Sequence, residues 1–196
     1  MASSSEQFLY QLLNLQIDFF VLDANSVISS ALPPCLNEMD GRNRRGATLK
    51  RLSTLKLLGE FFLPSKTYEI LKKVFVEVCE ERRRRKEKRG EAVKEITEEE
   101  LLGLLEATLE HLSPEIIQEA KYESYLETPL CGMLRKVDWE DAHVLAAAFY
   151  LRGKGSVAVV SGDKHFGNIK KELEKEGLLL INPYKDLGGD DDNYMG

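Results

Sequence analysis

Short apolar runs alternate with stretches of helical periodicity along this 196-residue chain. The segment 18–32, DFFVLDANSVISSAL, begins with an apolar run that ends at Asp23. The Asn-Ser pair that follows favours a turn into a helix. We therefore expect a buried strand with a carboxylate at its carboxyl end.

The next part of the chain repeats this order of elements. Leucines recur on one helical face over residues 49–59, and a short apolar strand is expected over residues 60–63. Ser65 can cap the helix that follows, whose apolar positions keep a 3.6-residue period as far as Val78. This helix carries Glu69 in its opening turns.

Residues 80–135 differ in character from the rest of the chain, and we predict that they form a helical insertion. They begin with the charged run EERRRRKEKRGE. Thr97 and Glu100 then have the spacing of a capping box, which predicts a helix start. Pro114, after Ser113, suits the first position of another helix because its missing N–H has no helical partner there.

The last third of the chain alternates helix and strand regularly. Helical patterns over residues 138–155 and 165–177 are each followed by an apolar strand pattern, over residues 156–163 and 178–183. This order predicts a parallel sheet covered by helices on both faces. We expect one α/β domain over residues 1–196, a three-layer Rossmann-like fold, with a frayed acidic tail at residues 188–196.

Composition excludes several classes of protein. Hydrophobic residues make up 43% and charged residues 31%, so the chain can fold around one core. The three cysteines, Cys35, Cys79 and Cys131, form no CxxC pair that would indicate a zinc site or a disulfide framework. With neither an apolar span nor an export signal in the sequence, we expect a cytoplasmic protein without a membrane segment. The net charge of −6 argues against a protein that coats nucleic acid.

Four acidic residues are the strongest indication of chemistry. Asp23 and Asp163 end two predicted strands, while Glu69 and Asp141 lie in the first turns of helices that begin on the same side of the sheet. Ligand sites of parallel sheets lie at the carboxyl ends of the strands. Four carboxylates in one place repel one another unless a cation joins them, which favours a Mg²⁺ or Mn²⁺ site.

Each acid also has an ordinary structural interpretation. Asp138 and Asp141 are three residues apart, as a helix cap and an acidic third position would be. Asp163 can cap the helix after it, and Glu69 can favour a helix N-terminus through the helix dipole. Asp23 is harder to explain in this way, because a charge in the middle of the fold requires a partner or a metal.

These segments resemble the PIN-domain nucleases, in particular the prokaryotic ribonucleases of archaeal type. FFVLDANSVISS is similar to the opening strand and turn of that family, and PSKTYEIL to its helix with an acid. DWEDAHVLAAAF and VAVVSGDKHF resemble its third and fourth acidic motifs. The resemblance covers roughly residues 18–80 and 136–183 and implies that the metal-binding, catalytic acids are Asp23, Glu69, Asp141 and Asp163. It also implies supporting roles for Asn25, Ser161 and Asp138.

The resemblance implies an endoribonuclease that hydrolyses RNA with a water activated by Mg²⁺ or Mn²⁺. Homodimers are common in the family, and a large group are toxins that an antitoxin neutralises. The insertion is a departure from the shorter toxins, so an RNA-processing role with a ribosome-assembly partner stays open beside the toxin role. The nature of the RNA is open as well.

Two other features have competing interpretations. The run Arg82, Arg83, Arg84 and Arg85 could bind RNA phosphates, or it could be a solvated helix face neutralised by glutamates four residues away. Trp139 could stack on a base, although a tryptophan at a helix start more often packs inside its own domain. For His143 and His165 we expect surface or capping roles rather than metal ligation.

Two other functions compete with the nuclease. An aspartyl phosphatase also starts from a strand that ends in Asp, but its second Asp is replaced here by Asn25. A non-catalytic PIN-like module could use the acidic edge to bind RNA or a protein. Retention of a repulsive set of four acids favours the enzyme over this module.

Overall fold

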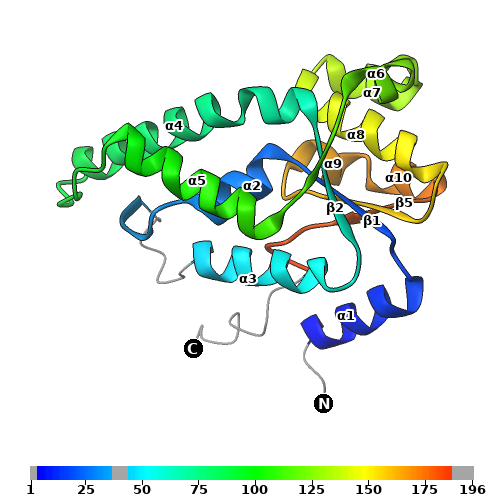
Figure 1. The fold of residues 1–196 in the computed structure, drawn as a ribbon, viewed down its shortest axis with the longest axis horizontal. Helices are drawn as coiled ribbons and strands as arrows, with labels where there is room; N and C mark the ends of the chain where they lie inside the picture. The colour runs from blue at the N-terminus through cyan, green and yellow to red at the C-terminus, as the bar shows by residue number, and fades with distance from the viewer. Residues whose placement is uncertain (1–3, 37–43, 187–196) are drawn as a thin grey trace.

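The computed structural model describes residues 4–36 and 44–186, and it confirms the predicted α/β class. Five parallel strands form one sheet in the order β3-β2-β1-β4-β5 (Figure 1). In chain order the strands are β1 (Phe19–Leu22), β2 (Glu60–Pro64), β3 (Glu115–Ile117), β4 (Val157–Val160) and β5 (Leu178–Ile181). The strands that carry Asp23 and Asp163 at their carboxyl ends, β1 and β4, are neighbours.

The sheet is covered on both faces, and its strands are apolar except at Glu60 and Glu115, the exposed first residues of β2 and β3. Alternate residues of β1 belong to different cores: Phe20 and Leu22 face one, and Val21 faces the other. The first layer contains α1 (Ser4–Leu15), α2 (Ala24–Ala31), α3 (Arg44–Lys56), α4 (Ser65–Lys88) and α5 (Glu98–Leu112). The second contains α6 (Glu119–Tyr122), α7 (Pro129–Arg135), α8 (Trp139–Arg152), α9 (Lys164–Asn168) and α10 (Lys170–Lys175).

Short polar motifs set several helix starts. Thr97 accepts a hydrogen bond from the backbone N–H of Glu100, and the Glu100 carboxylate accepts from the N–H of Thr97, as the predicted capping box requires. Asp138 caps α8 in a related way, by accepting from the N–H of Glu140. The short 3₁₀ helices η1 (Pro34–Leu36) and η2 (Glu123–Glu127) complete the described helices.

The prediction that a helix starts at Pro114 is wrong. Ser113 takes a left-handed conformation, with φ of 46°, and ends α5. The three residues after Pro114 then form β3, which pairs in parallel with β2 from Phe62↔Glu115 to Pro64↔Ile117. A three-residue edge strand is too short to show a period in the sequence, so only its pairing with β2 reveals it.

The charged run lies on α4, which extends beside α5 away from the sheet (Figure 1). Three of its arginines are within ion-pair distance of a glutamate one helical turn away: Arg83 with Glu87, Arg84 with Glu80, and Arg85 with Glu81. This arrangement supports the solvated-face interpretation of the run. Phosphate binding by Arg82 and its neighbours stays a prediction.

Two further predictions concern the acidic tail and the absence of a membrane segment. The acidic tail predicted at residues 188–196 lies outside the described residues. Within the described part, no helix combines the length and the apolar character needed to cross a membrane.

Candidate metal centre

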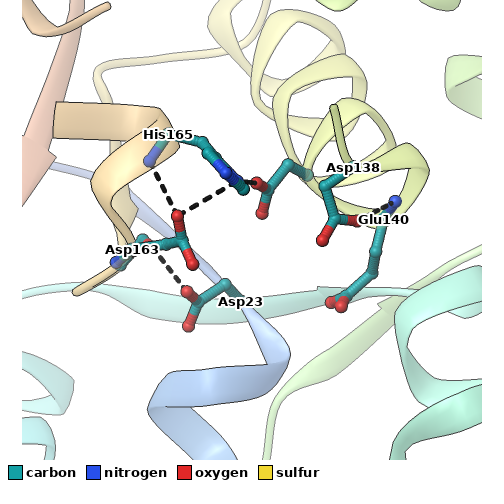
Figure 2. Close-up of polar contacts among 7 residues, drawn as sticks. Asp23, Asp138, Glu140, Asp163 and His165 are labelled. Carbon is teal, nitrogen blue, oxygen red and sulfur yellow. Dashed lines mark hydrogen bonds and ion pairs between the residues drawn. The ribbon is translucent and has the colours of Figure 1, made fainter. Parts of the chain in front are cut away.

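Acidic side chains gather where β1 and β4 end and α8 begins (Figure 2). The loop after β1 brings Asp23, the loop after β4 brings Asp163, and the start of α8 brings Asp138, Glu140 and Asp141. Neighbouring parallel strands end at the same edge of the sheet. Asp23 and Ser161, which are 138 residues apart in the sequence, therefore come into contact. The structure thus brings together three of the four predicted acids.

Asp23 is the most deeply buried acid of the group, with 2% of its surface exposed. Its Oδ1 accepts a hydrogen bond from the N–H of Ser26 at 2.6 Å, which caps α2, and its Oδ2 accepts from the hydroxyl of Ser161 at 2.5 Å. Burial raises the pKa of Asp23 to about 6, and these hydrogen bonds act in the opposite direction. Both oxygens are therefore held in place at the end of β1.

Ser161 connects Asp23 with Asp163. While its hydroxyl donates to Asp23, the same oxygen accepts from the N–H of Asp163 at 3.0 Å. Asp163 caps α9 by accepting from the N–H of His165 at 2.7 Å. These contacts orient the acids that follow both strands, whereas the supporting role of Ser161 in binding stays a prediction.

Asp138, Asp141 and His165 form a group that could hold a metal ion. Each offers one ligand atom, and these atoms lie within 4.8 Å of one another. His165 Nδ1 lies 3.0 Å from Asp141 Oδ2 and 3.2 Å from Asp163 Oδ1, so the imidazole joins acids of α8 and of the β4 loop (Figure 2). The surface or capping role expected for His165 therefore does not account for all of its contacts, because its ring lies beside two carboxylates.

The pKa of Asp141 shows the electrostatic cost of this arrangement. This pKa is raised to about 7, with burial as the largest cause and with the charges of Asp138, Asp163 and Asp23 acting in the same direction. The hydrogen bond with His165 lowers it. Oxygen ligands joined by one imidazole suit small divalent cations, and a bound cation would relieve this repulsion. The donor set therefore fits a metal.

Glu140 is an acid of this centre that the sequence analysis did not identify. Its Oε1 accepts a hydrogen bond from the N–H of Ala24 at 3.3 Å, which places it beside the start of α2. Burial and then the charge of Asp23 raise its pKa to about 8. A third acid within four residues, in D-W-E-D, was the available signal, but helix starts often carry acids and the pattern alone was ambiguous.

Glu69 pairs with a lysine of its own helix. Its carboxylate is 3.2 Å from Lys66 Nζ, which also pairs with Glu119 at the same distance. Within the described residues it forms no hydrogen bond or ion pair with Asp23, Asp141 or Asp163. Its position in the opening turns of α4 agrees with the prediction, whereas its role as a ligand stays a prediction.

Asn25 and His143 differ in their surroundings. Asn25 is exposed in the first turn of α2, and the neighbouring Ser26 makes the contact with Asp23. His143 is buried beside Tyr122, with Nδ1 3.3 Å from the phenol oxygen, and burial lowers its pKa. For neither residue does the structure give a contact with the group of Asp138, Asp141 and His165.

The fold and this centre define an all-parallel α/β protein with a metal-competent acidic site at the carboxyl edge of its sheet. Comparison with protein-family models, curated proteins and solved structures finds no match to the chain. Its function must therefore be inferred from the site.

Proposed function

We propose that the protein is a divalent-metal-dependent endoribonuclease of the PIN-domain type, with Mg²⁺ or Mn²⁺ as its cofactor. The observation that carries the proposal is the convergence of Asp138, Asp141 and His165 beside Asp23 and Asp163, at the edge where parallel sheets bind ligands. RNA as the substrate comes from the resemblance of the motifs around these acids.

The residues of the centre would have different roles in phosphodiester hydrolysis. Asp138, Asp141 and His165 would hold the cation, and Asp23 and Asp163 complete the negative surroundings that favour its binding. When bound, the cation supplies charge neutralisation at the phosphate and lowers the pKa of a water molecule. Glu140, whose raised pKa lets it carry a proton near neutral pH, would exchange that proton with a reacting group.

The contacts of Asp23 argue against the aspartyl phosphatase. A nucleophilic carboxylate must present a free oxygen to the phosphorus atom. Both oxygens of Asp23 accept hydrogen bonds, from Ser26 and Ser161, and the side chain is buried. These contacts favour a carboxylate that orients and attracts a cation over one that attacks the substrate.

The test is cleavage of an end-labelled single-stranded RNA in Mn²⁺, in Mg²⁺ and in EDTA. Asp141→Asn should reduce the cleavage rate at least 100-fold, because it removes one donor charge from the centre, and it keeps an oxygen for His165. Asp23→Asn should act similarly while still capping α2, since Asn is as good a cap as Asp. Calorimetry with Mn²⁺ reports whether each variant still binds the ion.

Asp18→Asn is the matched control. Asp18 flanks the opposite, amino end of β1, where it accepts hydrogen bonds from the N–H and hydroxyl of Ser156. Its variant should cleave like the wild type. Intact RNA in every metal, together with no Mn²⁺ bound, would refute the nuclease and favour the non-catalytic module.

Glu69→Gln tests the fourth acid of the prediction separately. If Glu69 acts on the cation through water or after a change of its pairing with Lys66, cleavage slows while folding is unaffected. An unchanged rate would restrict the centre to the acids of β1, β4 and α8. Assembly into homodimers, and pairing with an antitoxin or a ribosome-assembly partner, stay predictions for sedimentation and affinity capture.

A further inference from the structure

His165 supplies the nitrogen donor in the group of Asp138, Asp141 and His165. Its backbone N–H donates to Asp163 at 2.7 Å, and the next residue, Phe166, is fully buried in the second core. These contacts hold the start of α9 against the β4 loop and leave the side chain of His165 21% exposed. The imidazole is therefore held beside the acids of the centre before any ligand binds.

The spacing of three donor atoms suits one metal ion. Nδ1 of His165 lies 3.0 Å from Oδ2 of Asp141 and 3.2 Å from Oδ1 of Asp163 (Figure 2). An octahedral ion with ligands about 2.1 Å away separates neighbouring ligand atoms by about 3 Å. The two distances therefore match those of one nitrogen and two oxygens around a common ion.

A hydrogen bond explains these contacts less completely. The same distances suit an N–H donor, but the single hydrogen on Nδ1 can donate with good geometry to only one of the two carboxylates. Asp163 Oδ1 also accepts the backbone N–H of His165, so it does not need the ring as a donor. A divalent ion would join all three atoms at once and neutralise the carboxylates around them.

We propose that His165 binds the ion through an imidazole nitrogen and thereby makes the centre select first-row metal ions, from Mn²⁺ to Zn²⁺, over Mg²⁺. The inference rests on the proposed metal centre and narrows the identity of its cofactor. Mg²⁺ takes oxygen ligands and keeps several of its waters, so an imidazole contributes little to its binding. Affinity for a site that contains nitrogen rises from Mn²⁺ to Co²⁺, and imidazole suits Zn²⁺ as well.

His165→Asn tests the nitrogen itself, because the side-chain oxygen of Asn can take the place of Nδ1 without a change in charge. Calorimetric titrations with Co²⁺ and with Mg²⁺ are compared for the two proteins. We expect Co²⁺ to bind the wild type at least about 100-fold more tightly than Mg²⁺. The variant should lose roughly tenfold or more of this ratio, through weaker binding of Co²⁺ alone.

His111→Asn is the matched control. His111 lies in the last turn of α5, where its Nε2 is 2.7 Å from the hydroxyl of Ser53 on α3. In the described part of the chain, no hydrogen bond or ion pair joins it to Asp138, Asp141 or His165. This variant should bind Co²⁺ and Mg²⁺ like the wild type.

Pulsed EPR of the protein loaded with Mn²⁺ detects a bound nitrogen without any substrate. The wild type and His111→Asn should show the coupling of a directly bound nitrogen, and His165→Asn should lack it. Isotope-labelled histidine in the wild type should change the coupling. The labelled wild type tests the inference even if His165→Asn does not fold.

The outcomes separate this inference from the proposed function. Mn²⁺ bound without a nitrogen coupling in the wild type, or an equal loss of Co²⁺ and Mg²⁺ affinity in His165→Asn, would overturn the nitrogen ligand and leave the metal-dependent nuclease in place. A nitrogen coupling from histidine in a protein that cleaves no RNA would support the ligand and contradict the nuclease. A protein that binds none of these ions would refute both.

Discussion

Burial changes the pKa values of several acidic residues in this protein. Asp23, Glu140 and Asp141 all have raised pKa values, to about 6, about 8 and about 7, with burial as the largest cause in each. A carboxylate that loses water without gaining a cation costs free energy, and neighbouring carboxylates add to the cost. The metal-free protein therefore keeps part of these carboxyl groups protonated at neutral pH, and the repulsion among them grows as pH rises.

Glu140→Gln should relieve part of that repulsion. The pKa of Glu140 in the folded protein is above its ordinary value of 4.5. The contribution of Glu140 to wild-type stability is therefore complete below about pH 4.5 and is lost as pH rises through about 8. Gln is uncharged and keeps an acceptor for the N–H of Ala24. In EDTA, the variant should be more stable than the wild type by roughly 2 kcal/mol at pH 9.

The measurement is urea denaturation of both proteins in EDTA at pH 5 and at pH 9. The advantage of the variant should be much smaller at pH 5, where the wild-type carboxyl group is protonated in the folded state. Equal differences at the two pH values would show that Glu140 is not buried as a neutral acid.

Ser161→Ala should weaken metal binding without unfolding the protein. The variant removes a donor to Asp23 and an acceptor for the N–H of Asp163, so the two acids lose their common orientation. Loss of such an outer partner typically reduces metal affinity by about 10–100-fold. Calorimetric titration with Mn²⁺ measures the change.

Ser156→Ala is the control for this variant. Ser156 precedes β4 as Ser161 follows it, and its hydroxyl also contacts an aspartate, Asp18, at 3.0 Å. Its loss should leave Mn²⁺ affinity at the wild-type value. A similar loss of affinity in both variants would mean that the effect comes from β4 as a whole and not from the contacts of Ser161.

At the scale of elements, the loop between β4 and α9 depends on the segment that follows β5. Tyr184 packs on Gly162, and its hydroxyl lies 2.6 Å from the hydroxyl of Ser29 on α2. A Cβ atom at Gly162 would lie 2.1 Å from the Tyr184 ring, closer than any real contact. The glycine thus lets the loop that carries Asp163 approach Tyr184.

Gly162→Ala should therefore destabilise the protein by roughly 1–3 kcal/mol, as overpacking does, and should lower Mn²⁺ affinity because the loop must move. Thermal unfolding and calorimetry provide the two measurements. Gly167→Ala is the control: Gly167 lies in α9 with open space around its Cα, so an added methyl group meets nothing. A neutral Gly162→Ala would show that the Tyr184 contact does not position the loop.

At the scale of the whole molecule, metal binding should be linked to folding. The unfolded chain has no assembled centre, so a cation that binds the native acids stabilises the folded state. At pH 7.5 and 100 times the dissociation constant, Mn²⁺ should raise the midpoint of thermal unfolding by roughly 5–10 °C relative to EDTA. Differential scanning calorimetry measures the shift.

The same shift should shrink as pH falls from 7.5 to 5. The carboxyl groups of Asp23 and Asp141 take up protons over this range, since their folded-state pKa values are about 6 and about 7, and protons then compete with the cation. Asp141→Asn should show little shift at either pH. A wild-type shift that is absent at pH 7.5 would contradict the metal centre itself.

The class of the fold and the positions of its acids follow from local patterns in the sequence. Apolar runs that end in Asp23 and Asp163, separated by helical periods, predict strands with carboxylates at one edge of a parallel sheet. The prediction of these elements succeeds because the periods of helices and strands depend on residue order alone. The apolar strands of a sheet that is covered on both faces can be recognised from residue order in the same way. The capping box at Thr97 is local in the same sense.

Tertiary structure decided which side chains meet. Glu140, Asp138 and His165 belong to the centre because α8 starts beside the ends of β1 and β4, and no period or motif encodes those distances. The same packing left Glu69 with Lys66 and made β3 a strand after Pro114. Side-chain orientation and the pairing of a short edge strand depend on contacts between residues far apart in the chain, which only folding brings together.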